Sequence, residues 1–227
     1  MLLPVRRALQ QQNAFGMVVL RIKDGPHSST AGPACVVSIL AQSYSPPETS
    51  SNAAVMVAVM GGPRGLHARV KHSSWVDERK HLEAARPAWA AEVLLCDQDG
   101  GILEGLLTNF CVVADHPQDP SRAALFMAPP SSPLLQGLHL QRVLQAAQLM
   151  GLPVVWQAPQ PSQRSSWREA FLTNCLRGLQ PVGEVRCPPD NFWGHAPWDV
   201  KLPVTDGEWT TRLRAAAKGL QQLTPAP

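Results

Sequence analysis

Tyrosine, lysine and long apolar runs are all scarce in this chain. Its 227 residues include one tyrosine, Tyr44, and five lysines. No apolar run reaches the roughly 18 residues that a membrane helix needs. The first residues also lack the apolar segment of about 7–15 residues that marks a secretory signal. We therefore expect neither a membrane partner nor secretion.

Charge is also sparse. Charged residues make up 16% of the chain and the formal net charge is +3. Basic residues form no stripe with interleaved aromatics, so nucleic acid is not an expected partner. Apolar residues make up 44%, which is enough for a hydrophobic core and excludes disorder of the whole chain.

The cysteine pattern excludes the usual disulfide and zinc frameworks. The cysteines are Cys35, Cys96, Cys111, Cys175 and Cys187. Their number is odd and no CxxC pair occurs, so we expect reduced thiols and a cytoplasmic protein, with an organelle address left open. His67, His72 and His81 lie around Lys71 without zinc-ligand spacing, so no metal site is expected. Neither a GxxxxGK(S/T) loop nor a GxSxG motif occurs.

The hydrophobic pattern predicts an α+β (α/β) fold. Short apolar runs follow one another between clusters of Gly, Pro and Ser, and Asp97 to Gly101 form a hairpin signal. Expected strands cover residues 17–22, 34–40, 54–60, 67–71, 91–96, 102–114, 125–128, 154–156, 171–173 and 183–186. Expected helices cover residues 1–13, 75–85, 138–150, 165–170 and 205–223. Residues 61–65, GGPRG, resemble a linker.

Two residues stand out for their chemistry. Lys71 ends the expected strand 67–71, where the simplest interpretation is a solvated surface lysine. Glu104 lies among leucines in an apolar strand, and burying a carboxylate is costly unless it is paired. The alternative for Glu104 is a surface carboxylate next to the hairpin.

The spacing of Lys71 and the E-G-x-x-x-N segment, residues 104–109, resembles the fold-type IV, or class IV, aminotransferase family. That family includes D-amino acid and branched-chain aminotransferases and aminodeoxychorismate lyase. Residues 132–138, SPLLQGL, and 171–182, FLTNCLRGLQPV, are similar to two further family segments in the same order. The resemblance implies a D-amino acid aminotransferase-like, pyridoxal phosphate-dependent fold. Residues 1–64 would be a remnant of its small N-terminal domain, and 65–227 the large cofactor-binding domain.

The resemblance also implies site roles. Lys71 would be the catalytic residue that forms a Schiff base with pyridoxal phosphate, with Arg69 as an accessory on the same face of the strand. Glu104 would pair with the pyridine nitrogen, and Gly105 would let backbone pass close to the ring. The phosphate would bind where helix 138–150 begins and at the segment around Thr173. The expected cofactor-binding residues are Lys71, Glu104, Gly137, Leu138, His139, Thr173, Asn174 and Cys175.

The simpler alternatives are a core-packing helix over 138–150 and turn chemistry at residues 173–174. The chain also departs from the family pattern. His139 replaces a phosphate-binding threonine, and Cys175 replaces a hydroxyl residue. No residue matches the small domain's phosphate arginine, although Arg64 or Arg69 could substitute for it. Tyr44 matches no cofactor tyrosine, and the chain is short for the family, so we expect coding sequence upstream of Met1.

These features predict a transaminase that moves an amino group between an amino acid and a 2-oxo acid. We expect it to act as a homodimer in amino-acid metabolism. One alternative is a lyase of the aminodeoxychorismate type, which would use Lys71 and Glu104 to eliminate pyruvate. The other is a non-catalytic relative that keeps the scaffold, which the missing phosphate ligands favour.

Overall fold

The computed structural model describes residues 16–24, 35–43, 53–203 and 207–223. The chain divides into two compact units, Met1–Thr49 and Ser50–Pro227. In the first unit, β1 (Gly16–Asp24) and β2 (Cys35–Ser43) pair antiparallel, which confirms strands over 17–22 and 34–40. The expected helix over 1–13 and Tyr44 lie outside the described residues.

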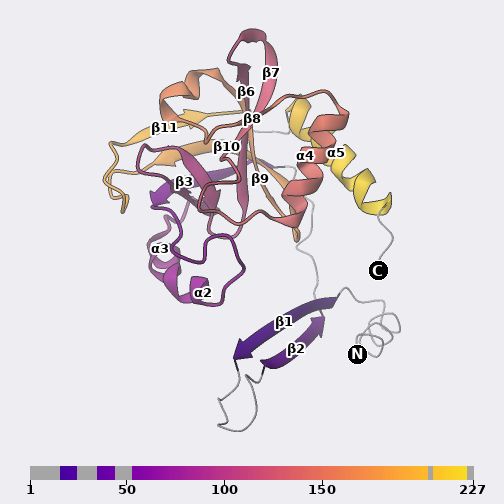
Figure 1. Cartoon of the computed structure of the whole chain (residues 1–227). Helices are drawn as coiled ribbons and strands as arrows, with labels where there is room; N and C mark the ends of the chain where they lie inside the picture. Colours follow the sequence, from indigo (N-terminus) through magenta and orange to yellow (C-terminus); the bar gives the residue numbers. More distant parts are fainter. Residues whose placement is uncertain (1–15, 25–34, 44–52, 204–206, 224–227) are drawn as a thin grey trace. The chain divides into compact units, whose positions relative to one another are not determined.

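The second unit contains a nine-stranded sheet and several helices (Figure 1). Its strands are β3 (Val55–Gly61), β4 (Glu92–Cys96), β5 (Ile102–Gly105), β6 (Asn109–His116), β7 (Asp119–Met127), β8 (Val154–Trp156), β9 (Trp167–Asn174), β10 (Gly178–Cys187) and β11 (Trp198–Lys201). Its helices are α2 (Ser74–Glu78), α3 (Lys80–Ala85), α4 (Leu138–Leu149), the 3₁₀ helix η1 (Pro161–Ser166) and α5 (Glu208–Leu223).

The strand pairings close part of this sheet into a ring. β3 pairs with β4, β4 with β5, β5 with β6, β6 with β9, β9 with β10, and β10 again with β3. One hydrophobic cluster draws its side chains from all of these strands, including Val57, Leu94, Phe110, Leu172 and Val185. Alternate residues of each strand therefore fill the interior of the ring, and the others face outward.

Helices cover two outer parts of the ring. Leu140, Val143 and Ala147 of α4 pack with α5 against outward-facing residues of β6 and β9. The predicted helix over 138–150 is confirmed, and Gly151, at φ 66°, follows it. Leu149, expected on its apolar face, is 71% exposed instead. α2 and α3 lie against β3 and β4 through Trp75 and Leu82.

The expected hairpin around residues 97–101 joins β4 and β5. Asp97 Oδ1 accepts the backbone N–H groups of Asp99 and Gly101, and Gly100 adopts φ 82°, which glycine tolerates best. The expected strand 102–114 is interrupted, because β5 ends at Gly105 and β6 begins at Asn109. The interruption forms the turn beside Glu104.

Two expectations from the sequence are wrong, and the position of one strand adds to the domain division that the sequence suggests. Residues 67–71 form turns rather than a strand, with backbone bonds from Ala68 to Gly65 and from Val70 to His67. Residues 167–170 belong to β9 rather than to a helix, because pairing with β6 and β10 overrides the local helical preference. The expected first domain, 1–64, included strand 54–60. That strand is β3, which lies between β10 and β4 in the second unit.

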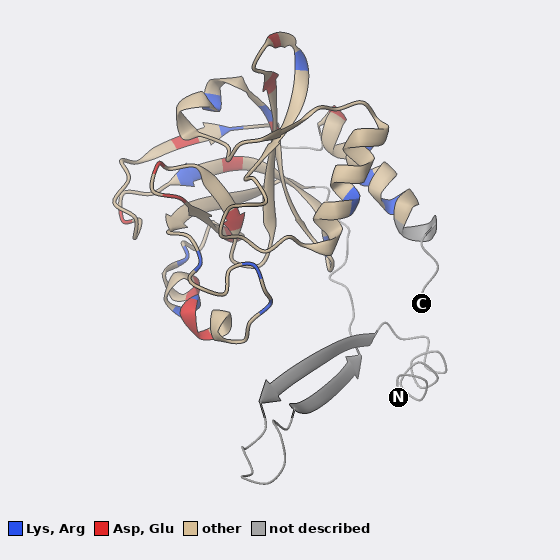
Figure 2. Cartoon of the chain, viewed as in Figure 1, with Lys and Arg blue, Asp and Glu red and all other residues tan. Residues whose placement is uncertain are grey.

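In the described part of the chain, charged residues lie on strands, loops and helices (Figure 2). Cys96, Cys111, Cys175 and Cys187 are free thiols, as expected for these four. Within the described ranges no helix is long and apolar enough to cross a membrane.

Candidate active site

Glu104 is a buried carboxylate near the end of β5. Its side chain is 4% exposed. The Leu135 backbone N–H donates to its two oxygens at 3.2 and 3.4 Å, and an Arg64 guanidinium nitrogen lies 3.6 Å from Oε1. The alternative of a surface carboxylate is therefore wrong. The expectation that a buried Glu104 must be paired is confirmed.

The burial of Glu104 also sets its acidity. Burial raises the pKa of its carboxyl to about 7, because the charged form loses its hydration, while Arg64 and the Leu135 N–H oppose that rise. A carboxyl with such a pKa can hold or release a proton near neutral pH. Perturbed carboxyl groups of this kind are typical of functional sites.

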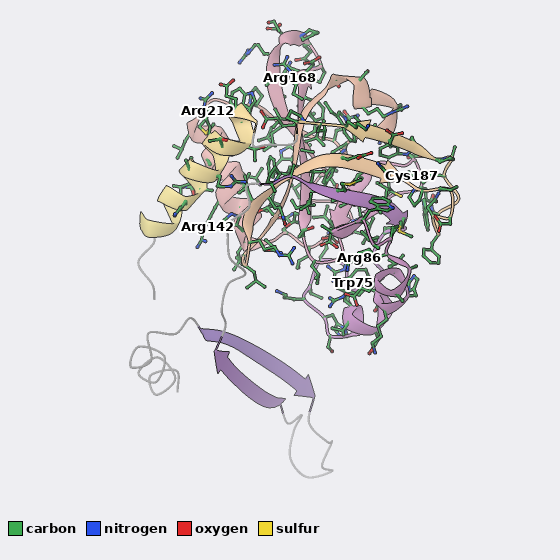
Figure 3. The ribbon with its side chains drawn as sticks, turned by 180° about the vertical axis from the view of Figure 1, so that it is seen from behind. Trp75, Arg86, Arg142, Arg168, Cys187 and Arg212 are labelled. Atoms are coloured by element: carbon green, nitrogen blue, oxygen red, sulfur yellow. The ribbon has the colours of Figure 1, made fainter. Side chains whose placement is uncertain are left out.

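Arg64 is the residue of this site whose role the sequence did not reveal. It follows β3, and its side chain is 6% exposed. Its guanidinium lies 4.6 Å from the ring centre of Trp75, which is labelled in Figure 3. The Trp75 ring is fixed by its own N–H, which donates to the Leu106 carbonyl at 2.9 Å. The arginine is thus placed beside Glu104.

Asn109 begins β6 and organises the loop in front of Glu104. Its Nδ2 donates to the Leu135 carbonyl at 2.6 Å, and its Oδ1 accepts the Gly137 N–H at 3.2 Å. The same loop supplies the Leu135 N–H to Glu104. Asn109 belongs to the E-G-x-x-x-N segment, but no sequence signal predicts that its side chain spans the loop.

Strand pairing aligns Glu104, Asn109 and Thr173. Glu104 is opposite Asn109 across β5 and β6, and Asn109 is opposite Thr173 across β6 and β9. Residues directly opposite one another lie on the same face of a sheet. Thr173 is 1% exposed, and its hydroxyl has no hydrogen-bond partner in the described part of the chain. Two separate family-like segments thus meet in one polar row.

Lys71 lies in an exposed loop between β3 and α2. Two contacts hold this loop. Arg69 donates to the Ser131 carbonyl, and a nitrogen of Arg64, which also contacts Glu104, lies 3.5 Å from the Val70 carbonyl. His67 and His72, on either side of Lys71, stack with ring centres 4.2 Å apart. Since no strand forms here, the argument that Arg69 and Lys71 share a strand face is wrong.

The expected phosphate donors at the start of α4 are partly used by the protein itself. The Gly137 N–H donates to Asn109, and the Leu138 side chain is 75% exposed. His139 is buried, and burial lowers the pKa of its imidazole, with Arg142 acting in the same direction. A neutral ring at position 139 can donate only one N–H.

The β9–β10 connection divides the remaining expected ligands. Asn174 Oδ1 accepts the backbone N–H groups of Leu176 and Arg177 at 3.0 and 2.9 Å, so its side chain performs the turn chemistry that was the simpler alternative. Cys175 is an exposed free thiol on that turn. Thr173 lies in β9 rather than in a turn.

Gly105 has a packing role rather than the expected one beside a ring. A Cβ added there would lie 2.9 Å from Glu92 Cγ and would overlap the Thr108 side chain. The space next to this glycine is therefore filled by protein, and Thr108 Oγ1 donates to Glu92 at 3.3 Å.

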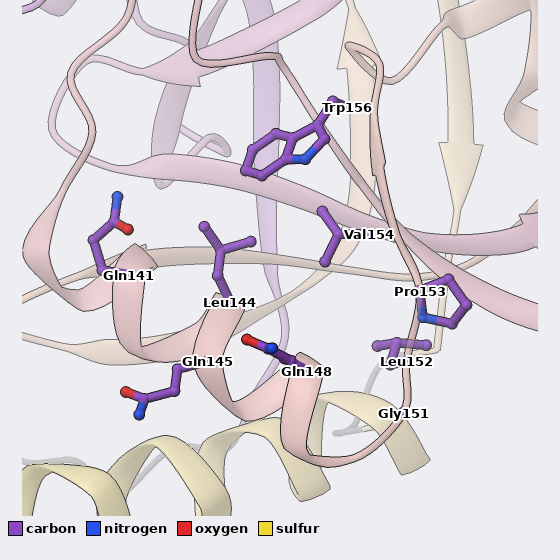
Figure 4. A pocket seen from close by; sticks show the side chains of 9 residues that line it. All are labelled: Gln141, Leu144, Gln145, Gln148, Gly151, Leu152, Pro153, Val154 and Trp156. Atoms are coloured by element: carbon purple, nitrogen blue, oxygen red, sulfur yellow. The ribbon is translucent and has the colours of Figure 1, made fainter.

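A surface hollow of about 620 Å³ lies elsewhere, between α4 and β8 (Figure 4). Glutamines 141, 145 and 148 line it from the helix, and Val154 and Trp156 line it from the strand. None of the expected site residues contributes to it.

Comparisons with known proteins show the family and the fold. The family model described as amino-transferase class IV matches residues 5–185. No curated protein matches the chain.

Similar solved structures include the branched-chain amino acid aminotransferase of Escherichia coli, with 20% identity, TM-score 0.67 and coverage of 95% of this chain and 68% of that one. A 4-amino-4-deoxychorismate lyase from Pseudomonas aeruginosa has 19% identity, TM-score 0.68 and coverage of 96% and 77%. A PLP-bound hypothetical aminotransferase from Mycobacterium tuberculosis has 16% identity, TM-score 0.65 and coverage of 96% and 73%. The structural matches show the expected fold, and the family match extends over most of the chain, so the chain belongs to the class IV aminotransferase family.

Proposed function

We propose that this chain is a pyridoxal phosphate-dependent transaminase acting on an amino acid and a 2-oxo acid. The observation that carries the proposal is the buried carboxyl of Glu104, which lies in register with Asn109 and Thr173 inside the family-like segments. A core built only for stability has little use for an ionisable group whose pKa burial raises to about 7.

The polar groups of the site fit this cofactor. Among the described residues, buried side-chain polar atoms without a partner are Arg64 Nε, Thr173 Oγ1 and His195 Nε2, and the first two belong to the candidate site. Such atoms are costly to bury, so their presence together indicates a polar ligand. The Thr173 hydroxyl and the start of α4 suit a phosphate, and Glu104 suits a pyridine nitrogen.

The family resemblance and the contacts of the site support the following roles. When bound, pyridoxal phosphate supplies an electron-withdrawing ring that stabilises negative charge on the substrate carbon. Lys71 would hold the cofactor through its Nζ, and as a free amine this group would carry the substrate proton. Glu104 would hold a proton at the ring nitrogen. Asn109 would keep the 135–137 loop, and with it the Leu135 N–H, in place.

Absorbance tests the proposal directly. Purified protein given pyridoxal phosphate should develop a visible absorption band that Lys71→Ala abolishes. Lys80→Ala is the matched control, since Lys80 is an exposed lysine paired only with Asp77 on a neighbouring helix. Borohydride reduction followed by peptide mapping should place the label on Lys71. A label on Lys80, or a band that survives Lys71→Ala, would refute the assignment.

The lyase alternative remains open because solved lyases share this fold with TM-scores of 0.68. A transaminase given a single amino acid should release a 2-oxo acid once and leave the cofactor in its amine form. A lyase should instead release pyruvate repeatedly from aminodeoxychorismate. A protein that takes up no cofactor would support the non-catalytic alternative.

We also propose a cytoplasmic homodimer whose second subunit covers the rim of the site. Large apolar residues near the site are about half exposed or more: Leu66, Val70, Leu107 and Leu176 in loops, and Leu138 at the start of α4. Exposed apolar side chains favour a protein partner when they lie together. Light scattering should give a dimer mass that falls towards the monomer in Leu66→Ser/Leu138→Ser. A monomeric parent protein would refute the dimer.

A further inference from the structure

Arg64 lies directly beside Glu104 in the candidate site. The two side chains are 6% and 4% exposed, and their closest charged atoms are 3.6 Å apart. The Leu135 N–H already uses both carboxylate oxygens. A ring nitrogen that approaches Glu104 therefore meets the guanidinium as a competitor for the same oxygens.

The contacts of Arg64 are weak for a buried cation. Its nitrogens lie 3.6 Å from Glu104 and 3.5 Å from the Val70 carbonyl, and Nε has no partner among the described residues. Hydrogen bonds of guanidinium groups are normally about 2.7–2.9 Å long. The Trp75 face supports the cation without fixing the direction of its N–H groups. Arg64 is thus held beside Glu104 and is not locked there.

We propose that Arg64 is a positioning residue that competes with the cofactor for Glu104, so that loading of the site requires this ion pair to open. The inference rests on the proposed function. Removing Arg64 would relieve the competition, because the carboxyl would then face the ring nitrogen alone. The cofactor-free protein would lose stability, because a buried carboxyl would lose its charge partner.

The test measures binding rather than turnover. Equilibrium dialysis gives the Kd of pyridoxal phosphate for the parent protein, for Arg64→Met and for both in a Glu104→Gln background. We expect Arg64→Met to bind at least about tenfold more tightly, and the gain to vanish when residue 104 is Gln. Arg79→Met, which removes an equal charge from a surface pair with Glu83, should leave Kd unchanged. Arg64→Gln is the second variant should the Met protein not fold.

Each outcome bears on the inference. Unchanged or weaker binding by Arg64→Met, with normal binding by the parent, would overturn the inference and leave the proposed function standing. Tighter binding that persists in the Glu104→Gln background would also overturn it, because the effect would not pass through Glu104. Binding by Arg64→Met alone would support it strongly. Binding by neither protein would refute both the inference and the proposed function.

Discussion

Replacing Glu104 by Gln should change how stability depends on pH. Burial raises the pKa of Glu104 from 4.5 to about 7 in the folded protein. The folded state therefore binds this proton more tightly than the unfolded state does. Stability from this group is fully present below the unfolded pKa and is lost as pH rises towards the folded value. At about 1.4 kcal/mol per pKa unit, the loss between about pH 4 and about pH 8 amounts to about 3 kcal/mol.

Urea unfolding of the cofactor-free proteins at several pH values provides the measurement. The free energy of unfolding of the parent, minus that of Glu104→Gln, should fall by about 3 kcal/mol across this range. Glu83→Gln is the control, because Glu83 lies on the surface beside Arg79 and should give no such slope. A difference that stays flat or rises with pH would show that Glu104 is not a desolvated carboxyl, and the reasoning on the site would fail.

Three further changes test individual contacts. Glu169→Ala removes a buried carboxylate that accepts the N–H groups of Trp209 and Thr210 at the start of α5. The free energy of unfolding should fall by about 2 kcal/mol. An unchanged urea unfolding curve would contradict this. Thr173→Val removes a buried hydroxyl that has no partner among the described residues. Urea unfolding should show the cofactor-free protein stabilised by about 1 kcal/mol. Dialysis should show weaker cofactor binding. Asn109→Leu should speed amide exchange over residues 134–138, because the loop loses the two bonds that the Asn109 side chain makes to it. Unchanged exchange would refute that role.

Much of the fold could be predicted from local pattern. α4 shows helical spacing of apolar residues and ends before Gly151 and Pro153, and the β4–β5 hairpin is marked by Asp97 and two glycines. These signals depend on neighbours in the chain, so they survive without tertiary information. The buried state of Glu104 was predictable for the same reason, since its neighbours in β5 are apolar.

Elements whose structure depends on distant partners were predicted less well. The segment 167–170 has no strong strand signal, and it becomes part of β9 because β6 and β10 lie on either side of it. The segment 67–71 alternates in a strand-like way, but the loop finds no partner strand and forms turns. The role of Asn109 depends on where residues 135 and 137 lie, which local sequence does not encode.

The contact between Arg64 and Glu104 was not predicted because it depends on where strand 54–60 lies in the sheet. If strand 54–60 belongs to a separate domain, Arg64 lies in a linker. The sequence then suggests Arg64 only as a substitute for the phosphate arginine of the small domain. In the structure β3 pairs with β4, β4 pairs with β5, and Gly61 and Glu104 are both in register with Leu95. An arginine three residues beyond Gly61 is then within reach of Glu104. The position of this strand therefore separates two roles for Arg64: binding the cofactor phosphate, or competing with the cofactor ring for Glu104. The direction in which Arg64→Met changes the Kd of pyridoxal phosphate distinguishes them, because the Kd should rise in the first case and fall in the second.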